Sequence, residues 1–393
     1  MTGVERPARG AAPATRPGLG SLPDFVLERF FDRFEFDLPY QLGSSDPETL
    51  SLAELLALAD GEARARWESL RLGYRTAAGD AALRAAIAAQ YPGRSADDVV
   101  VTVGAAEALL LAFAASIEPG DAVVALSPAY QSLHEMPRAM GAELRTVAVE
   151  QIGADAPRWR FPLERLMDAL VAGVRVLALN VPHNPTGVAL GPDDLVAVAA
   201  RCEERGIRLV GDEVYRGLEW QGGTAPAVAS TSGRAVSIGV TSKVYGLAGL
   251  RIGWLVTGDR SLRDRAIAIK DYTTLCAPGP SEALATVALR AHDHLVRRTR
   301  DRCIANMAAL EAFVESDPQH FAWARPQATT ISVARVGGRA VDRDGSPDAV
   351  LARWRAAGVL VVPGTAFGCD PGTFRLGFGR TDLPAALAAL AAG

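Results

Sequence analysis

Short apolar runs alternate with amphipathic segments of helical periodicity through the middle of the chain. The runs are rich in Val, Ile, Leu and Ala and carry few charges, which is typical of strands buried on both faces of a sheet. Because helical segments separate them, they predict βαβ units and a mostly parallel sheet covered by helices. The seven expected strands are 99–103, 122–126, 144–149, 174–180, 207–211, 235–240 and 252–256.

The pattern changes toward both ends of the chain. Aromatic residues recur at helical spacing in 22–36, which predicts a helix packed on the body. One long helix, or two consecutive ones, is expected over 281–314, followed by shorter strands and helices. The expected domains are a large one at 46–275, a smaller α+β one formed by 276–393 with 21–45, and a disordered tail at 1–20 that is rich in Pro, Gly, Ala and Arg.

The composition limits the partners that the protein can have. Its 393 residues, 49% of them apolar and 22% charged, suffice for two ordinary globular domains. A net charge of −4 provides no basic surplus to neutralise phosphates, which argues against general nucleic-acid binding. The four cysteines are far apart, and no apolar run is long enough to span a membrane. We expect a cytoplasmic protein with no nucleic-acid, membrane or metal partner.

Lysine is rare in this chain. Only Lys243 and Lys270 among the 41 basic residues are lysine, and the others are arginine. A desolvated lysine can lose its proton and attack a carbonyl carbon, whereas arginine cannot. Lys243 follows the apolar run 235–240 and precedes a glycine-rich loop, a usual place for a functional residue in an α/β protein. Lys270 ends an amphipathic helical pattern, so we expect it to be solvated. If the protein forms a Schiff base, we expect Lys243 to carry it.

Other chemistry-bearing residues follow the expected strands, at the sheet edge where α/β proteins bind ligands. Gly104 lies between a strand and a helix whose free amides and dipole suit a phosphate, and Arg251 is a second candidate for that anion. Asp212 ends a buried strand, which is costly unless a partner such as a protonated pyridine nitrogen faces it. Arg375 lies in a strand-like run and suits a carboxylate. Each of these residues, taken alone, has a plainer structural explanation.

Taken together, these positions belong to an ordered series of motifs. The series is GYRTAAGDAALR, VGAAEALL, SPAYQSL, NVPHNPTG, DEVY, SKVYGLAGLRIGW, VVPGTAFG and FRLGFG. It resembles the class I/II aminotransferases, which are pyridoxal-5′-phosphate (PLP) enzymes of fold type I, over nearly the whole of 43–379. The resemblance implies an α/β fold with a large domain around a mostly parallel seven-stranded sheet and a smaller α+β domain. It also implies a homodimer with the active site at the subunit interface and an amino acid as substrate.

The resemblance implies a role for each matching residue. Lys243 would form the Schiff base, Asp212 would pair with the ring nitrogen, and Tyr215 would join them as a catalytic residue. The implied cofactor-binding residues are Lys243, Asp212, Tyr215 and Asn184 around the ring, Tyr130 over its face, and Ala105, Ala106, Arg251 and Tyr74 of a second subunit at the phosphate. The implied substrate-binding residues are Arg375, the Gly43 backbone and Asn184.

One position departs from the pattern of the family. Three residues before the lysine, the family commonly has a serine or threonine whose hydroxyl binds phosphate, and here that position is Val240. Thr241 or Ser242 could supply the hydroxyl instead, or the phosphate could depend more on Arg251. The departure affects the detail of the phosphate site and not the choice of cofactor.

Two further motifs bear on the reaction. SKVYGLAGLRIGW and KDYTTL, at 270–275, resemble the capreomycidine synthase branch of the family. That resemblance implies elimination of the β-hydroxyl of a β-hydroxylated arginine, followed by cyclisation through its guanidine, in antibiotic biosynthesis. Asp46, Glu48 and Glu107 are candidate partners for the guanidinium.

Three alternatives remain open. The first is an ordinary aminotransferase that exchanges an amino group with a 2-oxo acid. The second is a non-catalytic PLP-binding regulatory module, which the short N-terminal segment and the net negative charge disfavour. The third is a metal enzyme built on His292 and His294, which have no obvious third ligand in the sequence and are therefore expected to be surface residues.

Overall fold

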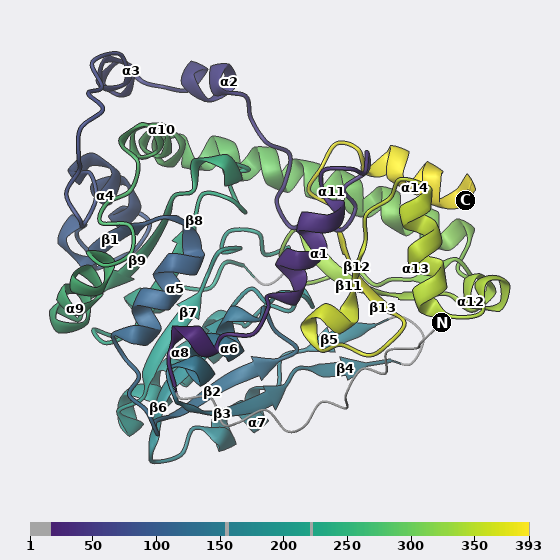
Figure 1. Ribbon diagram of the computed structural model, residues 1–393, viewed down its shortest axis with the longest axis horizontal. Helices are drawn as coiled ribbons and strands as arrows, with labels where there is room; N and C mark the ends of the chain where they lie inside the picture. The colour runs from purple at the N-terminus through teal and green to yellow at the C-terminus, as the bar shows by residue number, and fades with distance from the viewer. Residues whose placement is uncertain (1–16, 154–156, 221–222, 393) are drawn as a thin grey trace, which may run out of the picture.

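The computed structural model describes residues 17–153, 157–220 and 223–392. A seven-stranded sheet with the strand order β1-β9-β8-β7-β6-β2-β3 forms its centre (Figure 1). The strands are β1 (Val99–Thr102), β2 (Ala122–Ser127), β3 (Glu143–Ala148), β6 (Val174–Asn180), β7 (Arg208–Asp212), β8 (Val236–Val240) and β9 (Gly253–Thr257). All seven predicted strands form this sheet, each within one residue of its expected bounds. The prediction of the large sheet is confirmed.

The direction of the strands decides where the polar residues meet. Strands β2, β3, β6, β7 and β8 are parallel, whereas β9 is antiparallel to its neighbours β1 and β8. The carboxyl ends of β6 and β7 therefore lie side by side, and Asn180 is in register with Asp212. Lys243 follows the end of the next parallel strand, β8, at the same edge.

Helices cover both faces of this sheet because successive side chains of a strand point to opposite faces. Val123 and Ala125 pack under helices α5, α6 and α9, whereas Val124 and Leu126 pack under α7 and α8. The helices are α5 (Gly104–Ala114), α6 (Ser132–Ala139), α7 (Leu163–Ala169), α8 (Pro192–Arg205) and α9 (Arg260–Lys270). At the β1 edge, α4 (Ala81–Ala88) and α10 (Gly279–Arg290) share a core with β1 and β9.

A second sheet, four-stranded and antiparallel, lies toward the C-terminal part of the chain (Figure 1). Its strands are β10 (Phe321–Ala322), β11 (Ile331–Val336), β13 (Thr373–Gly377) and β12 (Val362–Pro363). It shares an apolar core around Trp354 and Phe374 with the helices that surround it. These helices are α11 (His292–Ser316), α12 (Gly338–Asp344), α13 (Pro347–Ala356) and α14 (Leu383–Ala392). The predicted helical stretch 281–314 consists of two consecutive helices, α10 and α11.

The N-terminal segment joins the two sheets. Helix α1 (Val26–Phe34) forms within the predicted 22–36, and its Leu27 packs against Val333 and Phe367 beside the second sheet. The Phe25 ring, just before α1, contacts the ring of Tyr130 at 5.0 Å between centroids. The remaining elements are η1 (Leu19–Ser21), α2 (Leu52–Ala57), α3 (Gly61–Glu68), η2 (Ala96–Asp98), β4 (Glu150–Ile152), β5 (Arg158–Arg160), η3 (Val228–Ser230), η4 (Ala248–Leu250) and η5 (Gly364–Phe367).

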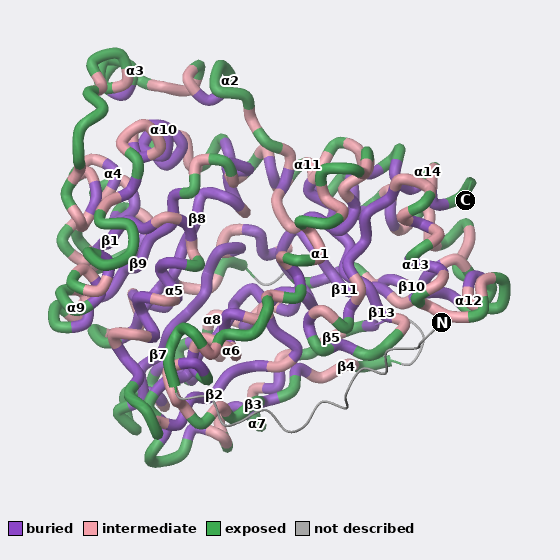
Figure 2. Tube along the Cα trace, in the orientation of Figure 1, coloured by how far each residue is buried: buried purple, intermediate pink, exposed green. Residues whose placement is uncertain are grey.

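Burial follows this architecture. Six strands of the large sheet are buried along most of their length, and the edge strand β3 is mostly exposed. Helices α2 and α3 project from the body and are largely exposed (Figure 2). In the part of the chain that the structure describes, no helix combines the length and apolar character needed to cross a bilayer. Residues 1–16 of the predicted tail lie outside the described residues, and the predicted domain boundaries at 46 and 275 stay predictions.

Candidate active site

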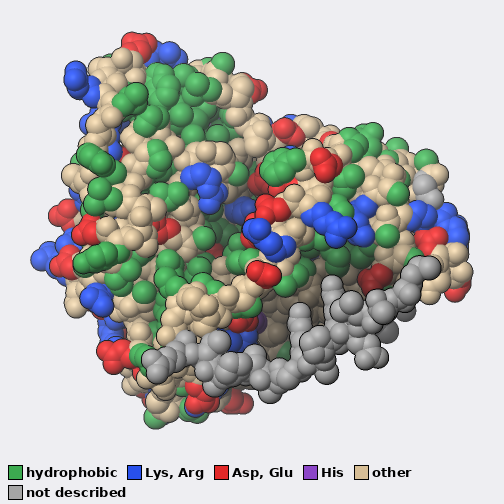
Figure 3. Space-filling model, in the orientation of Figure 1, with side chains coloured by type: hydrophobic (Ala, Val, Ile, Leu, Met, Phe, Trp, Pro, Cys, Tyr) green, Lys and Arg blue, Asp and Glu red, His purple; other side chains and the backbone are tan. Residues whose placement is uncertain are grey.

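A cavity of about 390 Å³ opens at the carboxyl ends of β6, β7 and β8. Residues of the large sheet, of β13 and of α1 line it together. Acidic and basic side chains gather over α1 near the middle of the face shown in Figure 3. The cavity brings together most of the residues predicted for the site, although they come from segments far apart in the chain.

Lys243 lies in this cavity, three residues after β8. Its Nζ donates a hydrogen bond of 2.7 Å to the Oγ of Ser45. Desolvation in the cavity lowers the pKa of the amine, and the nearby positive charges of Arg375 and Arg251 act in the same direction, while Asp46 opposes them. A lowered pKa increases the fraction of neutral amine, which is the form that can attack a carbonyl carbon.

Asp212 lines the same cavity and is 5% exposed. Burial raises the pKa of its carboxyl group to about 7, against a hydrogen bond from the Val214 amide and the charge of Lys243. No salt bridge to Asp212 occurs within 17–153, 157–220 and 223–392. A buried carboxylate without a cationic partner is costly, so this arrangement fits a ring nitrogen that carries a proton.

The loop after β6 is held to β7 by Asn180. The side-chain Nδ2 of Asn180 donates a hydrogen bond of 2.9 Å to the backbone carbonyl of Asp212. The side-chain Oδ1 of Asn180 accepts a hydrogen bond of 2.6 Å from the backbone N–H of Asn184. These bonds place Asn184 at the cavity, which Tyr215, 1% exposed, also lines. Both X-Pro bonds of this loop, Val181–Pro182 and Asn184–Pro185, are cis. The predicted pair for the ring hydroxyl, Asn184 and Tyr215, therefore lies in one place.

The first turn of α5 is built to receive an anion. No side chain caps this helix, so its first amides are available, and Ala105 and Ala106 line the cavity. Gly104 has φ +77°, and a Cβ at this position would lie 2.6 Å from Nη2 of Arg251. Only glycine therefore lets the Arg251 guanidinium lie directly over the turn. This arrangement suits a phosphate group.

The hydroxyls of Thr241 and Ser242 were both considered as replacements for the one missing at Val240, and the structure gives them different surroundings. The Oγ1 of Thr241 lies within hydrogen-bond distance of the carbonyls of Leu247 and Ile252, and it holds the loop. The Oγ of Ser242 is buried, lines the cavity and has no hydrogen-bond partner among the residues that the structure describes. Ser242 is thus the hydroxyl available to a ligand.

Arg375 lies on β13, a strand of the second sheet, and lines the cavity from there. It is 1% exposed, and its Nη2 donates to the carbonyl of Gly43 at 2.8 Å. The rings of Phe31 and Phe367 lie 5.8 and 4.9 Å from its guanidinium carbon. Its Nε has no partner in the described part of the chain. A held, planar guanidinium with an unused donor suits a substrate carboxylate.

Of the remaining predicted residues, Tyr130 and Asp46 line the cavity, whereas Tyr74, Glu48 and Glu107 do not. Tyr130 lines the cavity, and its phenol donates to Glu28 at 3.1 Å. Tyr74 does not line it and is 89% exposed, so its role in a second subunit stays a prediction. Glu48 binds Thr381, and Glu107 accepts hydrogen bonds from the hydroxyls of two threonines after α9. Of the three candidates for a guanidinium partner, only Asp46 lines the cavity.

The prediction that Lys270 is solvated is wrong. This lysine is 0% exposed, and its Nζ donates to the carbonyls of Ala77 and Leu275 at 2.8 and 3.3 Å. The helical pattern placed it correctly at the end of α9 but carried no information about the segment 76–79, which packs across it. The two lysines of the chain therefore have different surroundings, and only Lys243 lies in the cavity.

Sequence reasoning missed the contribution of the N-terminal segment. Glu28, Glu35, Phe31 and Ser45 line the cavity, and none was expected there. A signal was present, because Glu28 and Glu35 are seven positions apart and Leu27 and Phe31 are four apart, which places each pair on one side of a helix. The aromatic residues made the segment resemble an ordinary packing helix instead.

Comparisons with known proteins agree with this geometry. Residues 40–390 match the family described as aminotransferase class I and II. Capreomycidine synthase of Streptomyces vinaceus is 32% identical over 97% of this chain and 95% of its own. The match to valine–pyruvate aminotransferase of Mycobacterium tuberculosis is 35% identical but spans only 56% of each chain. The structure of the PLP-dependent cyclase OrfR superposes with a TM-score of 0.83 at 29% identity, over 98% of both chains.

The residues of the cavity fit PLP on their own evidence: an amine of lowered pKa, a buried carboxylate without a cation, and an uncapped helix start beneath an arginine. The family match covers most of the chain, and the fold superposes on that of a PLP-dependent cyclase over almost its whole length. This protein therefore belongs to the class I and II aminotransferase family and is a PLP-dependent enzyme.

Proposed function

We propose that this enzyme acts on a β-hydroxylated arginine, eliminates its β-hydroxyl group and closes a ring through the guanidine. The observation that carries the proposal is the set of carboxylates at the cavity. Glu28, Glu35 and Asp46 line it together with Arg375. The same cavity therefore offers an arginine for the substrate carboxylate and carboxylates for a cationic substrate side chain. The likeness to capreomycidine synthase and to the cyclase OrfR over almost the whole chain supports the same reaction.

Glu35 is the best candidate partner for the guanidinium. Asp46 is already paired with Arg380 at 2.7 Å, and Glu28 accepts a hydrogen bond from Tyr130. Glu35 has no salt bridge within the described ranges, and burial and then Asp46 raise the pKa of its carboxyl group. A substrate cation beside Glu35 would remove that electrostatic penalty. A neutral side chain would not.

The residues of the chain have separate tasks in this reaction. Bound PLP supplies an electron sink for the electron pair left at the substrate α-carbon. Arg375 and the Gly43 segment orient the carboxylate, which holds the α-carbon near Lys243. The Nζ of Lys243 takes the α-proton and later delivers a proton to the departing β-hydroxyl, which leaves as water. Asp212 keeps the ring nitrogen protonated.

The remaining site residues hold the cofactor. Asn184 and Tyr215 are suited to the ring hydroxyl and Tyr130 to the ring face. The phosphate group is assigned to the amides of Ala105 and Ala106 together with Arg251. Ser242 adds the hydroxyl that Val240 lacks, and Thr241 supports the loop from behind.

Product analysis distinguishes this function from its rival. The enzyme is incubated either with β-hydroxyarginine alone or with an amino acid and 2-oxoglutarate, and the products are identified by mass spectrometry. The proposal expects a product that has lost one water and needs no 2-oxo acid. Exchange of the amino group with the 2-oxo acid, without loss of water, would identify an ordinary aminotransferase, which the partial match to valine–pyruvate aminotransferase favours.

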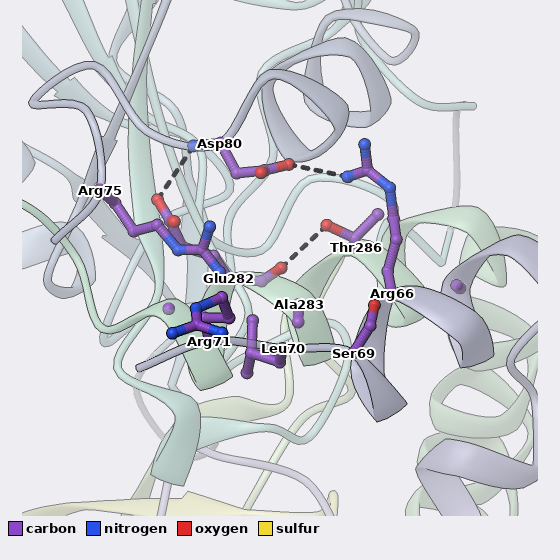
Figure 4. Close-up of a pocket in the computed structure, with 11 residues that line it drawn as sticks. Arg66, Ser69, Leu70, Arg71, Arg75, Asp80, Glu282, Ala283 and Thr286 are labelled. Carbon is purple, nitrogen blue, oxygen red and sulfur yellow. Dashed lines mark hydrogen bonds and ion pairs between the residues drawn. The ribbon is translucent and has the colours of Figure 1, made fainter. Parts of the chain in front are cut away.

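A homodimer belongs to the same proposal. Leu72, Tyr74 and Tyr272 are 84%, 89% and 93% exposed, which is unusual for large apolar side chains that face water. A second cavity of about 350 Å³ opens beside the segment 69–75, which contains Tyr74, and is bordered by Arg66 and Arg75 (Figure 4). A second copy of the chain covering this face would bury these side chains and bring Tyr74 toward the phosphate site of its partner.

A further inference from the structure

Ser45 lies at the reacting end of the cavity, and neither the motifs nor the comparisons assign it a role. Its hydroxyl accepts the hydrogen bond from Nζ of Lys243 at 2.7 Å. Its other neighbour is Tyr215: burial raises the pKa of this phenol to about 12, although the charge of Arg375 and a hydrogen bond with the Ser45 side chain both act to lower it. The hydroxyl therefore lies between the amine that reacts and the phenol assigned to the cofactor ring.

The backbone around Ser45 is fixed by the second sheet. The carbonyl of Ser45 accepts a hydrogen bond of 2.6 Å from the hydroxyl of Thr330. The neighbouring Ser44 presses so closely on β13 that a Cβ at Gly377 would lie 2.0 Å from its carbonyl oxygen. The Gly377 amide also donates to the carbonyl of Leu42 at 2.5 Å. The position of the Ser45 hydroxyl is thus set by the fold and not by a flexible loop.

Lys243 must gain and lose a proton in the proposed reaction. A hydroxyl beside its amine suits this role better than a carboxylate would. A carboxylate would hold the ammonium form strongly and keep the amine from acting as a base. The chain has a carboxylate next in sequence, Asp46, but Arg380 engages it at 2.7 Å. A neutral hydroxyl accepts a hydrogen bond from either form of the amine and favours the ammonium form much less than a carboxylate does, so it fixes the place of Nζ without preventing the loss of its proton.

We propose that Ser45 is a positioning residue, whose hydroxyl holds the Nζ of Lys243 in place for proton transfer whenever that amine is free. In every turnover of a Schiff-base enzyme the substrate displaces the lysine, and the released four-carbon side chain has many rotamers. One hydrogen bond to a rigid acceptor restricts them to the one near the substrate α-carbon. The inference rests on the proposed role of Lys243 but not on which substrate is used.

The rarity of lysine gives a direct test. In protein labelled with ¹³C at the lysine Cε atoms, the full chain has only two such signals, from Lys243 and Lys270. The Lys243→Ala variant assigns them, and a pH titration before PLP is added reports the pKa of Lys243. Because a hydrogen-bond acceptor favours the ammonium form, Ser45→Ala should lower this pKa by about one unit, a tenfold change in acidity. The charges that face the amine, Asp46, Glu28, Arg375 and Arg251, are unchanged in this variant.

The chain offers a matched control in the adjacent residue. Ser44 is buried and its Oγ lies 3.5 Å from Gln41, so Ser44→Ala removes a hydroxyl of the same segment without touching Lys243. It should leave the Lys243 titration unchanged. The pair Ser45→Thr and Ser45→Val extends the test, since the two side chains have the same shape and only Thr retains the hydroxyl. Thr should titrate as the wild type does, and Val as Ala does.

In the holoenzyme, Ser45→Ala should slow exchange of the substrate α-proton about tenfold or more and increase the isotope effect of α-deuterated substrate. Its substrate affinity, measured by absorbance titration, should stay unchanged. An unchanged Lys243 titration in Ser45→Ala, or the same shift in Ser44→Ala, overturns the inference. A shifted titration in an enzyme that exchanges amino groups instead of losing water would refute the cyclisation while leaving the role of Ser45 intact.

Discussion

The guanidinium of Arg375 donates a hydrogen bond of 2.8 Å to the carbonyl of Gly43, a residue 332 positions away in the sequence. The bond joins β13 to the segment that carries Ser45, and both residues were expected at the substrate carboxylate. Because the arginine is held by this carbonyl and by the rings of Phe31 and Phe367, its orientation does not depend on a substrate.

Arg375→Ala should therefore weaken substrate binding more than turnover. A bidentate contact to a carboxylate contributes about 2–3 kcal/mol, which corresponds to a loss of affinity of roughly 30- to 150-fold. Arg335→Ala, on the neighbouring strand β11, is the control, since Arg335 does not line the cavity. Absorbance titration with an amino-acid ligand measures both. An affinity within twofold of the wild type would contradict the assignment of Arg375.

The two lysines should respond differently to substitution. Lys243→Ala should lack the absorbance of the aldimine with PLP, because no other described lysine amine lies in the cavity. Lys270→Met and Lys270→Ala should retain the aldimine absorbance but be less stable by about 1–3 kcal/mol, since the carbonyls of Ala77 and Leu275 lose a buried donor. Absorbance spectra and chemical denaturation check both parts. Bleaching by the Lys270 substitutions alone would exclude Lys243 as the Schiff-base residue.

Glu35→Gln should reduce affinity for ligands with a cationic side chain. We expect binding of L-arginine, which contains no β-hydroxyl and cannot be cyclised, to weaken by about tenfold, because one charge partner is lost. Binding of L-citrulline, which is similar in shape but neutral, should change little. Asp32→Asn, on the helix α1 that ends just before Glu35, is the control, because its side chain is 61% exposed and pairs with Arg29. Equal losses for both ligands would show that Glu35 does not read the charge.

Mixing two inactive variants tests the proposed dimer. Tyr74→Ala should bind PLP more weakly, and Lys243→Ala should form no Schiff base, so each alone has little activity. If Tyr74 completes the site of its partner, a hybrid dimer contains one site with both residues intact. Refolding an equal mixture should then restore roughly a quarter of the wild-type activity, since half of the dimers are hybrids with one complete site each. No recovery in a mixture that sedimentation shows to be dimeric would exclude this contribution.

Glu282 should make stability depend on pH. It is 1% exposed, its Oε1 accepts from the Asp80 amide, and burial raises the pKa of its carboxyl group to about 7. Between its unfolded value near 4.5 and about 7, the folded protein binds a proton that the unfolded chain has released. The contribution to stability is therefore present at low pH and is lost as the pH rises through this window, at no more than about 1.4 kcal/mol per pH unit.

Glu282→Gln should remove that contribution. Gln retains the acceptor for the Asp80 amide and cannot ionise, so the stability difference between the variant and the wild type should shift in favour of the variant from pH 5 to pH 8. Denaturant unfolding at several pH values measures the difference. Parallel pH profiles of the two proteins would show that Glu282 titrates as it does in the unfolded chain.

Much of the site could be predicted because its signals are local. The motif SKVYGLAGLRIGW places Lys243 after a strand, and the apolar run before Asp212 places that carboxylate at the end of the next strand in the sheet. Parallel strands bring their carboxyl ends to one edge whatever the rest of the chain does. The convergence of Asn184, Asp212 and Lys243 in one cavity follows from this rule alone.

The N-terminal contribution could not be predicted in the same way. Ser45 reaches Lys243 across 198 positions, and only the packing of the segment 42–46 against β13 brings them together. Glu35 and Phe31 face the cavity because α1 lies between the two sheets, and helical periodicity defines a face without saying what that face meets.

Lys270 shows the same division between local and distant information. The sequence by itself determined that this lysine ends a helix, that seven strands form the central sheet, and that Lys243 follows one of them at the edge where ligands bind. Tertiary structure alone decided that Lys270 is buried beneath Ala77, that Glu28 and Glu35 border the cavity, and that Ser45 accepts a hydrogen bond from Lys243. The physical reason is that periodicity and composition report which surfaces a segment can bury, whereas the partner of each surface is chosen by contacts between residues far apart in the chain.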